Sequence, residues 1–181
     1  MTSYPEETLL TSEQVETLID ALARGIHADI THPHKRVVIG IRRGGALIAD
    51  RVRARLNTLL NMTLPIGYLD ITFYRDDLDT IGPNPVVQAT DLTMPIDDKR
   101  IILVDDVLFT GRTIRAAMNA LFDYGRPEIV DLMVLVDRGH RQLPICPDYC
   151  GLKVDTDRDG ESIKLQVDSA GDLSVKRRKL A

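Results

Sequence analysis

The sequence predicts an α/β fold with a mostly parallel sheet flanked by helices. Three continuous apolar runs, at 36–41, 100–106 and 129–136, are rich in β-branched residues and separated by segments with helical spacing. Such strands are typical of a parallel sheet covered on both faces. With 181 residues, 44% of them hydrophobic and 28% charged, we expect a single domain over residues 1–181.

The first half of the chain opens with an amphipathic helix and continues as strand, glycine loop and helix. Thr11 and Gln14 fit a capping box, and the apolar residues that follow at helical spacing are Val15, Leu18, Ile19, Leu22 and Ile26. The run 36–41 then ends in a loop with two arginines and two glycines. Helical spacing returns at Ile48, Val52, Leu56 and Leu59.

The same unit recurs in the second half. Strand 100–106 leads through loop 107–112 into a helix whose apolar face is Ile114, Ala117, Met118 and Leu121. Gly125, followed by Pro127, is expected to cap the end of that helix. Strand 129–136 follows.

Two regions depart from this pattern. Residues 68–74 alternate as a strand does, but 75–92 are rich in Asp, Pro, Gly and Asn without a period, and a connection of that length is usually functional. Near the C-terminus, short runs at 152–154 and 163–167 flank the turn signal 157–160. They predict a small terminal β-hairpin that forms a hood against the core.

Composition excludes several classes of protein. The 23 basic and 27 acidic residues give a net charge of −4, so no general positive field attracts nucleic acid. The two cysteines do not form the framework of a small secreted domain, which favours a reducing, cytoplasmic location. No stretch reaches the ~18 apolar residues of a membrane span, so we expect no membrane association.

The most informative segment is 101–113. An apolar strand delivers Asp105 and Asp106 to its C-terminal end, where open α/β sheets bind ligands. A loop with hydroxyls and a glycine then meets a helix N-terminus, which offers free N–H groups to a phosphate. The succession of apolar strand, acidic pair, loop and helix N-terminus predicts a ligand with both sugar hydroxyls and phosphate. The alternative is that the acidic pair merely caps a loop, but this would not explain why all four features follow one another.

Residues 101–113 resemble the 13-residue phosphoribosyl pyrophosphate (PRPP) motif of type I phosphoribosyltransferases. Segments 70–78, 125–127 and 134–145 are similar to the PyrR family, which combines pyrimidine operon regulation with uracil phosphoribosyltransferase activity. The resemblance extends over nearly the whole chain. It implies transfer of the 5-phosphoribosyl group from PRPP to N1 of uracil, which gives UMP and pyrophosphate, with Mg²⁺ bound mainly through PRPP and no protein metal ligand.

The resemblance also assigns site residues. Asp105 and Asp106 would be catalytic and hold the ribose hydroxyls. The PRPP site would comprise Val104, Asp105, Asp106, Val107, Leu108, Phe109, Thr110, Gly111, Arg112 and Thr113. Pyrophosphate would be bound by Arg42, Arg43, Gly44 and Arg75, and uracil by Val136, Asp137, Arg138 and Ile163.

One position departs from the family. Many members have Thr-Arg-Gly in the pyrophosphate loop, whereas this chain has Arg43-Gly44-Gly45, so glycine stands where arginine is usual. Either a neighbouring arginine compensates, or the long segment that Arg75 opens, a mobile hood in this family, contributes more.

Two other functions stay open at this point. One is an RNA-binding transcription attenuator that responds to UMP or UTP; the other is a phosphoribosyltransferase for another base, such as hypoxanthine. In regulatory members the first helix supplies basic side chains to RNA, but here 13–29 carries four carboxylates against Arg24. We therefore expect weak, salt-sensitive RNA binding. The remaining basic candidates for RNA are Arg51, Arg53 and Arg55 on the next helix and residues 176–179 at the C-terminus, although we favour solvated helix charges and a frayed tail as their interpretation. The family suggests a homodimer or higher homo-oligomer.

Three patterns are interpreted as incidental. His140, Cys146 and Cys150 lack an evident fourth zinc ligand. Segment 155–166 begins like an EF-hand loop but ends in Gln instead of Glu. The loop 40–45 lacks the lysine of a P-loop, so ATP chemistry is not supported.

Overall fold

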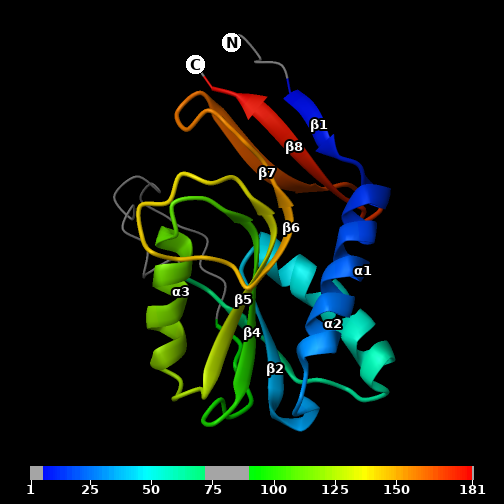
Figure 1. Cartoon of the computed structure of the whole chain (residues 1–181), viewed down its shortest axis with the longest axis vertical. Helices are drawn as coiled ribbons and strands as arrows, with labels where there is room; N and C mark the ends of the chain where they lie inside the picture. Colours follow the sequence, from blue (N-terminus) through cyan, green and yellow to red (C-terminus); the bar gives the residue numbers. More distant parts are fainter. Residues whose placement is uncertain (1–5, 72–89, 181) are drawn as a thin grey trace.

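The computed structural model describes residues 6–71 and 90–180, and its central element is a five-stranded sheet (Figure 1). In spatial order the strands are β3 (Ile66–Leu69), β2 (Arg36–Ile41), β4 (Arg100–Leu108), β5 (Ile129–Asp137) and β6 (Tyr149–Lys153). Each neighbouring pair in this sheet is parallel. The predicted α/β class is therefore confirmed.

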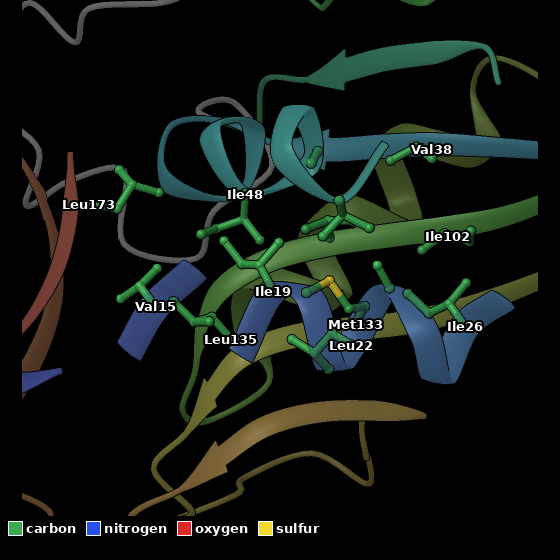
Figure 2. Packing of buried hydrophobic residues seen from close by; sticks show 14 of the residues in the cluster. Val15, Ile19, Leu22, Ile26, Val38, Ile48, Ile102, Met133, Leu135 and Leu173 are labelled. Atoms are coloured by element: carbon green, nitrogen blue, oxygen red, sulfur yellow. The ribbon is translucent and has the colours of Figure 1, made fainter. Parts of the chain in front are cut away.

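Helices cover both faces of this sheet. On one face lie α1 (Ser12–Asp29) and α2 (Gly44–Leu60), and on the other α3 (Arg112–Phe122); a short 3-10 helix, η1 (Pro33–Lys35), precedes β2. Along β4 the side chains alternate: Ile102 packs with α1 and α2 (Figure 2), whereas Ile101 packs with α3. Burial on both faces explains why these strands are continuously apolar.

The N-terminus of α1 carries the predicted capping box. The Thr11 hydroxyl oxygen accepts a hydrogen bond from the Gln14 N–H at 3.4 Å, and the Gln14 side-chain oxygen accepts one from the Thr11 N–H at 2.9 Å. Val15 and Ile19 then face the core with no exposed surface. The cap satisfies donors that the helix itself leaves unpaired.

The structure has a terminal β-hairpin, but the strand 163–167 pairs with a later strand and not with residues 152–154, as predicted. An antiparallel sheet has the order β1 (Glu6–Leu10), β8 (Leu173–Lys179), β7 (Glu161–Val167), and the turn between its last two strands lies at 168–172. Residues 152–153 instead lengthen the parallel sheet as part of β6. Residues 176–179, expected to fray, are paired in β8. A strand pattern identifies a strand but not its partner, which is why the pairing was wrong.

Three element boundaries also differ from the sequence pattern. Strand β3 begins at Ile66 and ends at Leu69, while residues 72–74 of the predicted strand lie outside the described residues. Strand β4 continues to Leu108, because its pairing with β5 extends past the acidic pair. Helix α3 ends at Phe122 with Asp123 as its cap, so the expectation that Gly125 caps it was wrong.

Arginines of α2 are paired with carboxylates of α1. Arg51 Nε lies 2.9 Å from a Glu16 carboxylate oxygen, and Arg55 binds both Glu16 and Asp20. Arg53 donates to the Leu64 carbonyl at 2.7 Å. The interpretation of these three as solvated charges was wrong. Packing of α1 on α2 brings Arg51 and Arg55 beside carboxylates, and Arg53 is bound to a carbonyl of the segment after α2.

We expect Thr11→Ala to lower the free energy of unfolding by about 1 kcal/mol, since it removes one side of the capping box. The control is Thr58→Ala, because Thr58 is exposed inside α2 and its hydroxyl bonds only within that helix; it should change stability by less than about 0.5 kcal/mol. Urea unfolding followed by circular dichroism measures both. Equal stability of the wild type and Thr11→Ala would contradict a stabilising cap.

Candidate functional site

The acidic pair lies near the C-terminal end of β4, inside the strand. Asp105 is 5% exposed and its carboxylate accepts a hydrogen bond of 3.0 Å from the Asp106 N–H. Asp106 is half-buried. The prediction placed the loop directly after the pair, but the strand continues, and the loop proper is 109–111. The two carboxylates therefore lie within the strand, as predicted, but two residues before its end.

The loop between β2 and α2 packs directly on this pair. A Cβ added to Gly44 would overlap the Asp106 carboxylate, and one added to Gly45 would overlap the Val104 carbonyl oxygen. Gly45 is thus required by the close approach of two backbones, whereas the neighbour of Gly44 is the Asp106 side chain. The structure brings Gly44 against Asp106, two residues to which the family resemblance gives roles in binding pyrophosphate and ribose.

Two arginines precede these glycines. The peptide between Arg42 and Arg43 is cis. The Arg42 guanidinium lies over the Tyr68 ring, 5.1 Å from its centroid, while Arg43 is exposed at the N-terminus of α2. Burial, followed by a hydrogen bond to Asp50, raises the pKa of Tyr68 to about 12. Arg42 is therefore held against a neutral aromatic ring. Arg75, the fourth predicted pyrophosphate residue, lies outside the described residues.

The predicted phosphate loop connects β4 to α3. Gly111 adopts a φ of +92°, which favours glycine, and α3 begins directly after it. The first N–H of the helix, that of Arg112, donates to the Thr110 hydroxyl oxygen at 3.4 Å. Thr110, Arg112 and Thr113 are at least partly exposed here. Val104 and Leu108 are buried in the core, so only their backbone can face a ligand. The loop has the form of an anion cradle at a helix N-terminus.

The loop after β5, predicted to bind uracil, lies against the phosphate loop. Asp137 accepts a hydrogen bond of 2.9 Å from the Gly139 N–H, and Val136 is fully buried. Arg138 donates its backbone N–H to the Leu108 carbonyl at 3.0 Å. Ile163, the fourth predicted residue, packs in the core between the sheets. Because its side chain is buried, Val136 could contact a base only through its backbone.

The Arg138 side chain connects two segments. Its guanidinium lies 3.9 Å from the centroid of the Phe109 ring. Its Nη2 donates to the carbonyl oxygen of Glu161, the first residue of β7, at 2.7 Å, and to that of Arg158 in the turn before β7 at 3.2 Å. Burial lowers the pKa of this guanidinium from its ordinary value. Arg138 thus joins the phosphate loop to the start of the terminal sheet.

Sequence reasoning missed Arg141. Its guanidinium forms an ion pair with Asp137 at 2.6 Å and donates to the carbonyl oxygens of Phe109, at 2.6 Å, and Ile145, at 2.9 Å. The N–H groups of the next two residues both donate to the Thr110 carbonyl. The spacing of four residues between Asp137 and Arg141 was visible in the sequence, but the contacts with the phosphate loop were not.

Among the candidate zinc ligands, His140 contacts other parts of the protein. His140 lies with Nε2 2.6 Å from the Thr156 carbonyl oxygen, and its ring meets Phe109 edge to face. Within residues 6–71 and 90–180, no three His, Cys, Asp or Glu side chains gather as metal ligands. His140 therefore belongs to the contacts between the phosphate loop and the turn before β7.

Comparisons with known proteins agree on the family. Residues 6–170 match the model of the phosphoribosyl transferase domain. Bifunctional protein PyrR of Roseiflexus sp. is 47% identical over 154 residues, which cover 85% of this chain and 84% of the relative. That of Deinococcus radiodurans is 41% identical over 170 residues, 93% of each chain. That of Syntrophobacter fumaroxidans is 43% identical over 159 residues, covering 88% and 86%.

Solved structures share the fold at lower identity. A hypoxanthine-guanine phosphoribosyltransferase of Bacillus anthracis superposes with a TM-score of 0.65 at 21% identity, covering 82% of this chain and 83% of that one. The likeness establishes the architecture alone. The family follows from the curated relatives: this chain belongs to the PyrR family of bifunctional proteins, built on a phosphoribosyl transferase domain.

Proposed function

We propose that this chain transfers the 5-phosphoribosyl group of PRPP to N1 of uracil and also regulates pyrimidine biosynthesis genes. The observation that carries the catalytic part is the contact between Gly44 and Asp106. It sets the acidic pair between two helix N-termini, those of α2 and α3, at the C-terminal edge of the sheet. A ligand with a hydroxylated sugar between two phosphate groups fits that order.

In the proposed reaction the bond from ribose C1 to pyrophosphate breaks, and its electron pair leaves with pyrophosphate. The bond from C1 to uracil N1 forms and the N1 proton is released. Because positive charge develops on the ribose, Asp105 and Asp106 stabilise it electrostatically while they orient the hydroxyls. No covalent nucleophile is required.

The anionic groups of PRPP occupy the two cradles. Thr110, Gly111, Arg112 and Thr113 hold the 5-phosphate, and Arg42, Arg43 and Gly44 hold pyrophosphate, together with Arg75. The Arg112 side chain is oriented by a hydrogen bond of 2.8 Å from its Nε to the Gln142 side chain. Mg²⁺, bound mainly through PRPP, would neutralise pyrophosphate charge; the hard carboxylate oxygens of the acidic pair are compatible with such a cation nearby.

The base is read by backbone groups of Val136 and Asp137, with Arg138 nearby. Support for reading by the backbone comes from the side chains of Asp137 and Arg138, which already have partners. Asp137 is paired with Arg141, and Arg138 contacts the Phe109 ring and the Glu161 carbonyl oxygen. The positions of the backbone donors and acceptors are thereby set before the base arrives. Ile163 contributes only through the packing beneath the loop.

The remaining proposals concern the oligomeric state, the location and the regulatory partner. We propose a homodimer or higher homo-oligomer that acts in the cytoplasm. In the described part of the chain, none of the helices has the length and apolarity to span a membrane. RNA is the proposed regulatory partner, bound weakly through phosphate contacts. The phosphoribosyltransferase for another base is disfavoured by the identity to PyrR relatives, which is about twice that to the hypoxanthine-guanine enzyme.

We expect Asp106→Asn to lower kcat by on the order of tenfold to hundredfold and to weaken PRPP binding much less, since the carboxylate acts mainly as charge develops. Steady-state kinetics of UMP formation, with PRPP affinity from calorimetry, measure the two effects. An unchanged thermal unfolding midpoint would exclude loss of fold. If Asp105→Asn and Asp106→Asn both kept full turnover, the catalytic assignment would be wrong.

We also expect strong selectivity for uracil. A site that hydrogen-bonds the uracil edge leaves its own groups unpaired with cytosine, which costs on the order of 10⁴-fold in kcat/KM, and purines should be too large. A panel of uracil, cytosine, hypoxanthine and guanine, assayed for PRPP-dependent nucleotide formation, measures this. Comparable kcat/KM for uracil and hypoxanthine would instead support the purine alternative.

A further inference from the structure

Tyr68 lies beside the loop between β2 and α2, near the end of β3. Strand β3 is at the edge of the parallel sheet and pairs with β2, where Tyr68 is opposite Gly40. Arg42 follows two residues after Gly40, and its N–H donates to the Leu69 carbonyl oxygen at 2.9 Å, which continues the pairing beyond β2. Because side chains two residues apart point to the same face of a sheet, Arg42 and Tyr68 share the face that α2 covers.

The side chains of Arg42, Tyr68 and Asp50 form a chain of contacts. The Arg42 guanidinium carbon lies 5.1 Å from the centroid of the Tyr68 ring, within the ~6 Å over which a cation is attracted to an aromatic face. The Tyr68 hydroxyl donates to an Asp50 carboxylate oxygen at 2.5 Å. Asp50 is exposed on α2, so the ring is tied to a second element. A change of the Tyr68 rotamer would lose both contacts.

The backbone of Tyr68 is paired as well. Its N–H donates to the Asp91 carbonyl oxygen at 2.9 Å, and its carbonyl oxygen accepts from the Asp91 N–H at 2.8 Å. Burial, followed by the hydrogen bond to Asp50, raises the pKa of Tyr68 to about 12, so the hydroxyl keeps its proton at neutral pH and remains a donor. The position of the ring is therefore set before any ligand binds.

The two arginines of the loop differ in how they are held. Arg43 is exposed and makes no capping hydrogen bond from its side chain at the start of α2. Arg42 is half-buried against the Tyr68 ring. A ring contact engages the face of a guanidinium, while phosphate is bound by the donors in its plane. An arginine that is ordered beforehand also loses less side-chain entropy when it binds an anion.

We propose that Tyr68 and Asp50 are positioning residues for the pyrophosphate group of PRPP, and that they act by holding the Arg42 guanidinium at the loop between β2 and α2. The inference rests on the proposed function, which assigns Arg42 to pyrophosphate, and it adds the two residues that order this arginine. Pyrophosphate gains negative charge as its bond to ribose breaks, and a cation already in place stabilises that charge without reorganisation.

A set of variants separates the ring from its hydroxyl. Tyr68→Leu removes both, Tyr68→Phe keeps the ring, and Asp50→Ala removes the acceptor; Tyr68→Phe is also combined with Asp50→Ala. Steady-state kinetics of UMP formation give the KM for PRPP and for uracil. Calorimetry in the presence of Mg²⁺ gives the Kd of pyrophosphate alone, and thermal unfolding reports the integrity of the fold.

The matched control is Tyr149→Leu. Tyr149 is half-buried on β6, the opposite edge strand of the same sheet, and its hydroxyl donates to Asp29 at 3.1 Å. Burial, followed by this hydrogen bond, raises the pKa of Tyr149 to about 12, as it does for Tyr68. The control therefore removes a tyrosine with the same kind of contact to a helix, but away from the loop between β2 and α2.

We expect Tyr68→Leu to raise the KM for PRPP and the Kd of pyrophosphate by about tenfold, as for a lost cation–π contact, with the KM for uracil within about twofold of the wild type. Tyr68→Phe and Asp50→Ala should each weaken pyrophosphate binding by only about threefold, as for one lost hydrogen bond. The double variant should be no weaker than either, because both changes remove the same hydrogen bond. Tyr149→Leu should leave all three constants at their wild-type values.

Other results would overturn the inference. Equal affinity of the wild type and Tyr68→Leu for pyrophosphate would show that the ring does not position Arg42, while the proposed function stood. An equal rise in the KM for PRPP and for uracil, or an equal effect of Tyr149→Leu, would show general destabilisation instead. If Tyr68→Leu did not fold, wild-type pyrophosphate affinity in Tyr68→Phe and Asp50→Ala would refute the inference.

The proposed function fails by a different result. If the wild type formed no UMP from PRPP and uracil, the assigned reaction would be wrong. Calorimetry would still decide the inference, which fails if the wild type binds pyrophosphate no better than Tyr68→Leu.

Discussion

The whole site depends on the close approach of the β2–α2 loop to strand β4. Gly44 lies against the Asp106 carboxylate and Gly45 against the Val104 carbonyl, with no room for a Cβ at either position. Because β2 and β4 are parallel neighbours, the helices that follow them, α2 and α3, begin at the same edge of the sheet. Their N-termini both present free N–H groups and positive dipole ends there. The acidic pair lies between these two positive ends, which is the charge arrangement that a diphosphorylated sugar requires.

A second layer of contacts holds the phosphate loop in place. Arg141 and Arg138 reach from the loop after β5 to the Phe109 carbonyl and the Phe109 ring, respectively. The same loop supplies two N–H donors to the Thr110 carbonyl. Donors that are fixed before substrate binds need no reorganisation during the reaction, so they stabilise developing charge more effectively. The loop assigned to the base thus also supports the phosphate cradle, and Arg138 extends this support to the start of β7.

The distribution of charge follows from the geometry of each element. Helix packing sets one row of α2 arginines beside one row of α1 carboxylates, and the two rows neutralise each other. Along β8 the basic run is divided by alternation instead. Arg177 turns to the inner face and pairs with Glu161 at 2.5 Å, whereas Lys176 and Arg178 face outward. A net negative chain can therefore present a positive surface.

The sequence alone determined the α/β class, the capping box of α1, and the presence of a glycine-containing loop after β2 and after β4, because apolar periodicity and glycine positions are local properties. It did not determine strand partners: residues 152–154 have the same alternation whether they join the parallel sheet or a hairpin. It also misplaced the end of β4, which depends on pairing with β5. The roles of Arg51, Arg55 and Arg141 were decided by tertiary structure, because each depends on a carboxylate or carbonyl that packing brings near. The fate of a charge depends on its neighbours in space, which a single sequence does not specify.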